Sequence, residues 1–322
     1  MRPKCWTTQA TRGEALPRLR LATSSRDIPV GAALAVGLAT FLRMPIVQNV
    51  LPAVNGTVQQ RIGDIFALWD ELSALGARKS DAAMKLCMER LCTWVHAQHA
   101  FWVAIEHTVG NGRQDLVDPL CGWRVRAIEP LYSRSHGRLD HRNLVRQMNA
   151  GRRAGDINVA LAAGAGFFRA YTLHSGDLVD MGAFRRASRC GCWYQLHDVH
   201  DRIWVAFPVN ADAESVFCFD RLGEQEQFTQ ADLDLAAFVL RGVKRFHHEL
   251  LLSYGIGLCA EPLTPSERRV IRLLIAGAPE RTIATELHFS QGTVHQYATR
   301  IYQKFGAHGR TEFTAMWLEG TG

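Results

Sequence analysis

Residues 263–313 read LTPSERRVIRLLIAGAPERTIATELHFSQGTVHQYATRIYQKFGAHGRTEF, and this stretch decides the fold of the last part of the chain. Its TPSE segment has the pattern of a capping box: the Thr264 hydroxyl accepts from the Glu267 amide, and the Glu267 carboxylate accepts from the Thr264 amide. Pro265 suits the first helical position, and Gly277 suits the left-handed residue that follows a helix. We therefore predict a helix between them that buries Val270, Leu273 and Leu274 at three- and four-residue spacing.

Two more helices follow, each with its own start signal. Pro279 opens the second, and Ser290 caps the third. The third places apolar residues on one stripe and polar or basic residues on the opposite stripe, which predicts one buried and one exposed face. A fourth short helix around residues 311–318 is expected to pack Phe313 and Trp317 onto the set. The inward side chains are Ile283, Ala284 and Leu287 in the second helix and Val294, Ala298, Ile301 and Phe305 in the third.

This order of helices and turns resembles the LuxR-type (FixJ/NarL-like) DNA-binding domain of bacterial transcription regulators. The resemblance implies a four-helix domain that binds DNA as a dimer on a two-fold site, with one helix in the major groove. The matching pieces are LTPSE at 263–267, the turn at Gly277, RTIATEL at 281–287, SQGTV at 290–294 and IYQKFGAHGRTE at 301–312.

The resemblance also implies which side chains would contact DNA. The chain departs from the usual family residues at three positions, where Tyr297 replaces a histidine, Arg281 a lysine and Glu280 an asparagine. Arginine preserves the phosphate-binding charge, whereas tyrosine preserves aromatic packing and puts one polar contact in doubt. On matched positions, Arg281, Thr293 and Lys304 would contact phosphates, and His295, Gln296, Thr299 and Arg300 would lie in the groove, with Arg300 best suited to guanine.

Basic residues are concentrated at the start of the chain and not in the DNA-binding stretch. The formal net charge is +6, and residues 1–43 hold seven Arg or Lys against Glu14 and Asp27. Residues 263–322 hold seven Lys or Arg against five Glu, which is a weak electrostatic footprint for a DNA-binding surface. The DNA-binding hypothesis therefore rests on the order of the motifs.

Residues 1–43 form an extension that is basic up to Asp27 and then apolar and uncharged from Ile28 to Leu42. The apolar stretch is shorter than the roughly 20 residues that a membrane-spanning helix needs. A basic-then-apolar order is also that of a signal peptide, but export does not suit a chain with a DNA-binding domain. We expect translation to start at Met44, with residues 1–43 a disordered arm or a mis-assigned start, and a cytoplasmic protein with no membrane partner.

Residues 44–254 are expected to form a mixed α/β sensor and dimerisation domain, which puts the chain in the α+β class. A linker at 255–262 would then lead to the DNA-binding domain at 263–322. Strands are predicted at 100–107, 167–173, 203–209 and 215–220, the last two joined as a hairpin by a turn with Asn210 and Asp212. Helices are predicted over 62–72, from about Ser80, and as one long helix over 229–254.

This layout resembles the GAF- or PAS-like sensor domains that precede LuxR-type units, chiefly in the order of elements and in the FTQADLDLAAFV entry to the long helix. The autoinducer-binding domain of quorum-sensing regulators is an alternative. It would carry a characteristic Trp, Tyr and Asp set before its central strands, and that set cannot be located in this sequence. A phospho-receiver domain fits less well, because its early acidic pair and later Asp and Lys are missing.

Two groups of residues are candidates for binding a signal. Aromatic side chains could line a pocket for a small-molecule ligand, and the candidates are Trp123, Trp193, Tyr194 and Trp204. Cys190, Cys192, His197 and His200 could hold a metal or form a thiol switch, although zinc usually has two to four residues between its cysteines. The eight scattered cysteines suit a reducing compartment and no disulfide framework. Because the spacing of Cys190 and Cys192 does not suit zinc, we predict no bound metal, and we also predict no cofactor.

The sequence lacks a phosphate-binding glycine loop, a nucleophile elbow and a zinc-protease histidine pair, so it offers no basis for an enzyme. We predict a transcription regulator whose N-terminal domain senses a signal and controls binding of a homodimer to double-stranded DNA, with RNA polymerase as a further partner. Two alternatives remain open: a constitutive DNA-binding protein with a dimerisation-only N-terminal domain, and a Cys/His-based metal or redox sensor.

Overall fold

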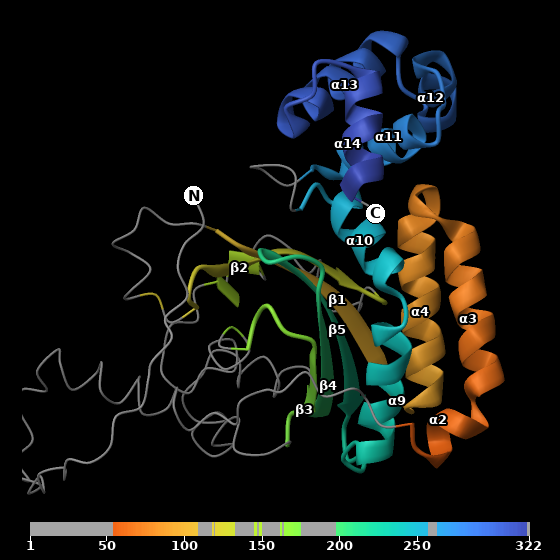
Figure 1. Ribbon diagram of the computed structural model, residues 1–322, viewed down its shortest axis with the longest axis vertical. Coiled ribbons are helices and arrows are strands. Elements are labelled where there is room, and N and C mark those ends of the chain that lie inside the picture. Colours follow the sequence, from red (N-terminus) through yellow and green to blue (C-terminus); the bar gives the residue numbers. More distant parts are fainter. Residues whose placement is uncertain are drawn as a thin grey trace, which may run out of the picture. The chain divides into compact units, whose positions relative to one another are not determined.

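A five-stranded antiparallel sheet with helices on one face forms the N-terminal domain (Figure 1). The computed structural model describes residues 54–108, 118, 120–132, 145–146, 148–149, 162, 164–174, 198–256 and 263–320. The strands are β1 (His99–His107), β2 (Trp123–Pro130), β3 (Arg169–Thr172), β4 (Val199–Pro208) and β5 (Ala213–Leu222), in the spatial order β2-β1-β5-β4-β3. The helices of this domain are α2 (Gly56–Gln60), α3 (Ile62–Leu75), the 3-10 helix η1 (Ala77–Lys79), α4 (Ser80–Trp94), α9 (Gln230–Arg241) and α10 (Lys244–Ser253).

This arrangement confirms the predicted α+β class, and helices before and after an antiparallel sheet are the layout that the GAF- or PAS-like resemblance implies. The predicted hairpin is β4 and β5, and its turn is closed by the Asp212 amide, which donates to Asn210 Oδ1 at 2.9 Å. Strand β2 is not among the strands predicted from the sequence. This strand lies at the edge of the sheet, and charged residues such as Arg124 and Arg126 obscure its apolar pattern.

The sheet has two different faces because successive side chains of a strand point to opposite sides. Ile203, Val205 and Phe207 of β4 join the large core that the sheet shares with the helices. Trp204 and Ala206 belong to a smaller cluster on the other face. The fully buried side chains of the large core include Trp102, Phe217, Phe219, Ile65, Leu68, Met88, Leu91, Leu235 and Leu240.

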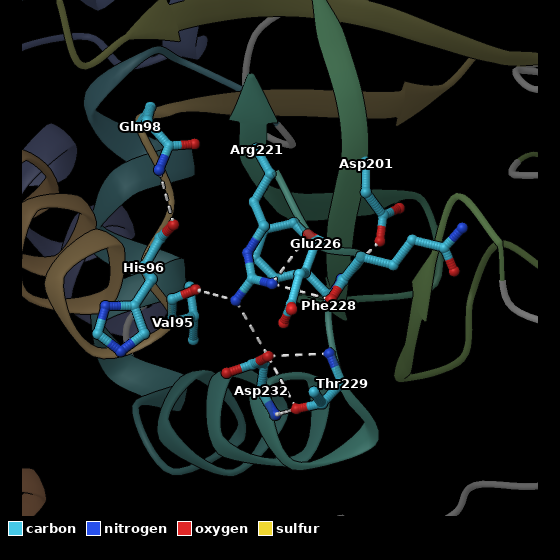
Figure 2. Close-up of polar contacts among 10 residues, drawn as sticks. Val95, His96, Gln98, Asp201, Arg221, Glu226, Phe228, Thr229 and Asp232 are labelled. Atoms are coloured by element: carbon cyan, nitrogen blue, oxygen red, sulfur yellow. Dashed lines mark hydrogen bonds and ion pairs between the residues drawn. The ribbon is translucent and has the colours of Figure 1, made fainter. Parts of the chain in front are cut away.

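Arg221, near the end of β5, anchors the start of α9 to the sheet (Figure 2). Its guanidinium donates to the carbonyl oxygen of Val95 at 2.9 Å and lies 3.2 Å from Asp232 Oδ2. Asp232 also accepts from the amide of Thr229, and the two residues form the capping box at the start of α9. The guanidinium packs over the Phe228 ring at 4.3 Å. Because both terminal nitrogens of the guanidinium have hydrogen-bond partners and its charge is paired with Asp232, this arginine can be nearly buried.

The single helix predicted over 229–254 is wrong. It begins as predicted, with Thr229 as the N-cap, but α9 ends at Arg241 and α10 begins at Lys244. The helix is therefore interrupted within the segment that was predicted to be one long helix.

The indole of Trp69 in α3 explains the break. Its Nε1–H donates to the carbonyl oxygen of Val239 at 3.0 Å. In an uninterrupted helix, that oxygen accepts from the amide of Val243. The ring also lies so close to Gly242 that a Cβ there would be 2.2 Å from Trp69 Cζ2. A glycine at this position lets the indole reach the helix backbone.

A buried chain of hydrogen bonds runs from the sheet to this break. The Trp102 indole N–H donates to the Ser215 hydroxyl at 2.8 Å, and His247 Nδ1 lies 2.8 Å from the same hydroxyl. His247 Nε2 lies 2.8 Å from the Leu240 carbonyl oxygen, which can only accept, so Nε2 carries the proton and Nδ1 accepts from Ser215. The ring stacks on Phe207 at 4.3 Å. Burial lowers the pKa of His247 to about 4, which keeps the folded protein's imidazole neutral.

The last four helices are those predicted: α11 (Pro265–Ile275), α12 (Glu280–Leu287), α13 (Gln291–Phe305) and α14 (Arg310–Gly320). Their apolar stripes meet in a second hydrophobic core, separate from that of the sheet. Each helix in the described part of the chain is too short or too polar to span a bilayer. The buried side chains include Val270, Leu273, Leu274, Ile283, Ala284, Val294, Ala298, Ile301, Phe305, Phe313 and Trp317, and Leu287 is half-buried.

We predict that His247 makes the protein less stable in mild acid. Above about pH 6.5 the imidazole is neutral in both the folded and the unfolded chain. As the pH falls towards the folded-state pKa of about 4, the unfolded chain binds a proton that the folded chain does not, so stability is lost. Between about pH 7 and about pH 5, the free energy of unfolding in urea should fall about 2 kcal/mol further in the wild type than in His247→Gln. An equal fall in both proteins would contradict this account.

Candidate nucleic-acid interface

The turn between α12 and α13 sets the direction in which α13 leaves the core. His288 ends α12 in the left-handed conformation, with φ 56°, and the Phe289 amide donates to the Ala284 carbonyl oxygen at 3.0 Å. Ser290 then caps α13, as predicted, because its hydroxyl accepts from the Thr293 amide at 3.0 Å. Two helices joined by a tight turn in this way form a helix-turn-helix unit.

Helix α13 buries one stripe and exposes the opposite one. The predicted stripe of Val294, Ala298, Ile301 and Phe305 is buried throughout. Four of the predicted DNA contacts, His295, Gln296, Thr299 and Arg300, lie together on the exposed side of α13, and Arg281 is exposed on α12. Thr293 and Lys304 are half-buried.

Lys304, a predicted phosphate contact, is paired within the domain. Its Nζ lies 2.8 Å from Oε2 of Glu267, which is 2% exposed. The same oxygen accepts from the Thr264 amide at 2.7 Å, which confirms the capping box at the start of α11. Although burial alone would raise the pKa of Glu267, the Lys304 ammonium and the Thr264 donors hold it below its usual value. Lys304 therefore ties α13 to α11, and any phosphate would compete with this carboxylate.

His295 and Arg300 each have a partner that the sequence analysis does not identify. His295 Nδ1 lies 3.3 Å from both carboxylate oxygens of Glu280, at the start of α12. The guanidinium of Arg300 lies 4.7 Å from the centre of the Tyr297 ring. The second pair has a sequence signal, because residues three apart are neighbours on a helix. The first has none, because it depends on how α12 and α13 pack.

Of the candidate ligand-binding residues, Trp193 and Tyr194 lie outside the described part of the chain. Trp204 is 4% exposed and lies on the sheet face away from the helices. Trp123 is half-buried at the first residue of β2, where its ring lies 5.3 Å from that of His107.

The structure does not bring Trp123 and Trp204 together. Trp204 pairs with Cys218, which pairs with Phe101 on β1. Trp123 pairs with His107, six positions further along β1. At about 3.3 Å per residue, this register separates the two tryptophans by roughly 20 Å, so they do not line the same part of the sheet.

The candidate metal or redox residues are only partly described. Cys190, Cys192 and His197 lie outside the described residues. His200 lies on β4, with its ring 6.3 Å from that of His174. Within the described ranges, no group of three or more His, Cys, Asp or Glu side chains could hold a metal ion.

The sheet face away from the helices also carries two buried arginine–carboxylate pairs. Arg169 Nη2 donates to Glu214 Oε2 at 2.8 Å, and its Nε donates to the Tyr171 hydroxyl at 2.8 Å. Arg202 Nη2 donates to Asp220 Oδ2 at 2.8 Å. Between them lies a cluster of apolar and aromatic side chains: Val103, Ile128, Tyr171, Leu173, Trp204, Ala206, Val216 and Cys218.

These pairs are not among the residues predicted from the sequence, although their spacing contains a signal. Arg202 precedes Trp204 by two residues, so both side chains point to the same side of β4. The guanidinium of Arg202 lies 4.6 Å from the ring centre of Phe101 and 5.6 Å from that of Trp204. Charged residues that alternate with aromatic ones on a buried strand indicate a polar site inside an apolar face.

Helix α11 contacts the N-terminal domain through arginines. Arg268 lies 3.8 Å from the ring centre of Tyr254, just after α10, and donates to Glu129 Oε1 on β2 at 3.1 Å. One turn further along α11, Arg272 pairs with Asp81 at the start of α4. These contacts link both the sheet and the helices of the N-terminal domain to the first helix of the C-terminal domain.

Comparison with known proteins identifies the C-terminal domain. Residues 261–317 match the family described as bacterial regulatory proteins, luxR family. The uncharacterized transcriptional regulatory protein YvfU of Bacillus subtilis is 37% identical over 73 residues, which are 23% of this chain and 36% of that protein. The response regulator RamR of Streptomyces coelicolor is 39% identical over 74 residues, which are 23% of this chain and 36% of that protein. These matches cover only about a third of each relative.

Among solved structures, SdiA in complex with octanoyl-rac-glycerol is 14% identical and covers 92% of this chain and 97% of its own, with a TM-score of 0.31. The family match and the helix geometry agree for the C-terminal domain. It is a LuxR-type helix-turn-helix domain, and its family is one of DNA-binding transcription regulators and not of enzymes.

We predict that Glu267 stabilises the folded state through its bonds to Thr264 and Lys304. Glu267→Ala removes a capping-box partner and leaves the half-buried Lys304 ammonium without its carboxylate. The free energy of unfolding in urea should fall by about 1–3 kcal/mol. Glu286→Ala is the control, because its ion pair with Arg78 is exposed and should contribute less than about 1 kcal/mol. Equal losses in the two variants would rule out a special role for Glu267.

Proposed function

We propose that this protein is a sequence-specific DNA-binding transcription regulator whose N-terminal domain senses a signal and controls promoter binding by a homodimer. The observation that carries the proposal is the exposed face of α13, where four hydrogen-bonding or basic side chains project from the second helix of a LuxR-type helix-turn-helix. The proposal retains the boundaries 44–254, 255–262 and 263–322, a cytoplasmic location and RNA polymerase as a further partner.

In this proposal, α13 enters the major groove and its exposed side chains read base edges. Arg300 suits guanine, because a guanidinium can donate two parallel hydrogen bonds to its O6 and N7. His295, Gln296 and Thr299 supply the other groove contacts. Arg281 and Thr293 would hold phosphates, and Lys304 would add a third phosphate contact by exchanging its bond to Glu267.

The signal is a small molecule bound at the sheet face away from the helices. Support comes from the apolar and aromatic cluster around Trp204 and Tyr171 and from the buried Arg202–Asp220 and Arg169–Glu214 pairs that flank it. Few polar groups set in an apolar surface are typical of ligand sites. Trp123, Trp193 and Tyr194 remain candidates for its outer parts.

Signal binding would reach the DNA-binding domain through α9 and α10. The break at Gly242 lets α10 move without the whole of α9, and His247 spans the break by bonding to Leu240 and Ser215. Tyr254, after α10, packs against Arg268 of α11. A ligand that shifts the sheet would therefore change how α10 holds α11, and with it the alignment of two recognition helices.

We predict that replacing Arg300 and replacing Arg281 weaken DNA binding in different ways. The protein is incubated with fragmented genomic DNA at a stated salt concentration, and the retained fragments are sequenced. Arg300→Ala should lose about 1–3 kcal/mol of specific binding and relax the preference at one base pair. Arg281→Ala should weaken binding on all sequences and lower the slope of log affinity against log salt by about 1.

A shared two-fold motif in the wild-type selection, changed by Arg300→Ala, supports the proposal. No enrichment, with or without cell extract as a source of signal, would reject a sequence-specific regulator. Enrichment that does not change with added extract would favour a constitutive DNA-binding protein.

We also predict that Arg268 couples the two domains. Arg268→Ala removes a partner from both Glu129 and Tyr254, so amide hydrogen exchange should become faster in α10 and the first turn of α11. Arg269→Ala is the matched control, because the neighbouring side chain is exposed and contacts Phe289 within the C-terminal domain. Unchanged exchange in Arg268→Ala would show that the contact does not hold the helices together.

A further inference from the structure

Four side chains form a row of cation–ring and ring–ring contacts across the helix-turn-helix, here called the stack. The guanidinium of Arg269 lies 5.4 Å from the ring centre of Phe289. The Phe289 and Tyr297 rings are 5.6 Å apart with an interplanar angle of 34°. Arg300 completes the stack 4.7 Å from the Tyr297 ring centre. The order of contacts is thus arginine, phenylalanine, tyrosine and arginine.

The stack joins three parts of the domain. Arg269 belongs to α11, Phe289 to the turn between α12 and α13, and both Tyr297 and Arg300 to α13. The two rings are half-buried and pack against the hydrophobic core of the domain, whereas both arginines are exposed. The rings are therefore fixed by the core, and the arginines rest on a fixed surface.

The contacts of Arg300 leave the outer edge of its guanidinium available to contact a base. Its Nε points to the Gln296 carbonyl oxygen at 3.4 Å, and one face of its guanidinium lies against Tyr297. Within the described residues, no carboxylate forms an ion pair with it. An exposed arginine ordinarily loses much side-chain freedom when it binds, and a ring that already restricts it reduces that loss.

We infer that Tyr297, supported by Phe289, is a positioning residue that holds Arg300 in the orientation needed to read a guanine edge in the major groove. The inference rests on the proposed function. An electron-rich phenol ring attracts a guanidinium over its face, and the contact with Phe289 restricts the movement of the ring. The specificity of this domain therefore depends on a residue that need not touch a base.

The test compares Tyr297→Leu with Tyr297→Phe in the full-length protein. Leucine keeps apolar bulk and removes the ring, whereas phenylalanine keeps the ring face. In the free protein with ¹⁵N-labelled arginine, the Arg300 Nε–Hε resonance is assigned by its loss in Arg300→Ala. We expect it to be ring-current shifted in the wild type and in Tyr297→Phe and to move towards the position of an unstacked arginine in Tyr297→Leu.

The second measurement is selection from a randomised DNA duplex. The guanine preference that Arg300→Ala removes should fall about two- to five-fold in Tyr297→Leu and persist in Tyr297→Phe. Adding Tyr297→Leu to Arg300→Ala should cause no further loss of that preference, since the ring acts through the arginine. Circular dichroism checks that Tyr297→Leu remains folded.

The outcomes separate the two proposals. If the wild type selects a motif and Tyr297→Leu keeps its full guanine preference, the positioning role is overturned and the proposed function stands. If the wild type selects no motif, the proposed function fails, and the reading role of Arg300 fails with it. An Arg300 resonance that is not shifted in the wild type, or that is the same in Tyr297→Leu, overturns the stacking itself.

Discussion

The burial of one stripe of α13 is the constraint on which the DNA-binding geometry depends. Val294, Ala298, Ile301 and Phe305 recur at three- and four-residue spacing, and each is at most 3% exposed. Burying side chains of this kind is worth about 1.5–3 kcal/mol each for the larger ones. Because a helix is rigid, fixing this stripe also fixes the opposite side, which presents Arg300 and its neighbours to solvent.

In the N-terminal domain, side chains of β4 alternate between two faces with a period of two residues, and burial of one face fixes the other in the same way. One side of β4 faces the helices, and the other carries Arg202, Trp204 and Ala206. The first side supplies the stability of the domain through a large apolar core. The second combines apolar packing with buried ion pairs, which are costly to desolvate and are therefore a poor source of stability. In the proposed function, these residues belong to the ligand site.

The connection between the domains includes several directional contacts. Trp69 breaks the helix at Gly242, His247 bridges the break, and Arg268 joins Tyr254 to Glu129. These polar and aromatic contacts are joined by apolar packing, because Leu252 of α10 and Ala77 of η1 belong to the hydrophobic core of the C-terminal domain.

The sequence by itself determined the structural features that depend on residues close together along the chain. The capping boxes at Thr264 and Thr229, the cap at Ser290, the buried stripe of α13 and the β4–β5 hairpin all follow from local patterns, and the exposed side of α13 follows from them. Only the tertiary structure decided the edge strand β2, the break between α9 and α10, the pairing of Lys304 with Glu267 and the stack that carries Arg300. Most of these features depend on contacts between residues far apart in the chain, such as the hydrogen bond from Trp69 to the Val239 carbonyl oxygen. A local sequence pattern does not indicate which distant side chain contacts a given backbone oxygen or aromatic ring.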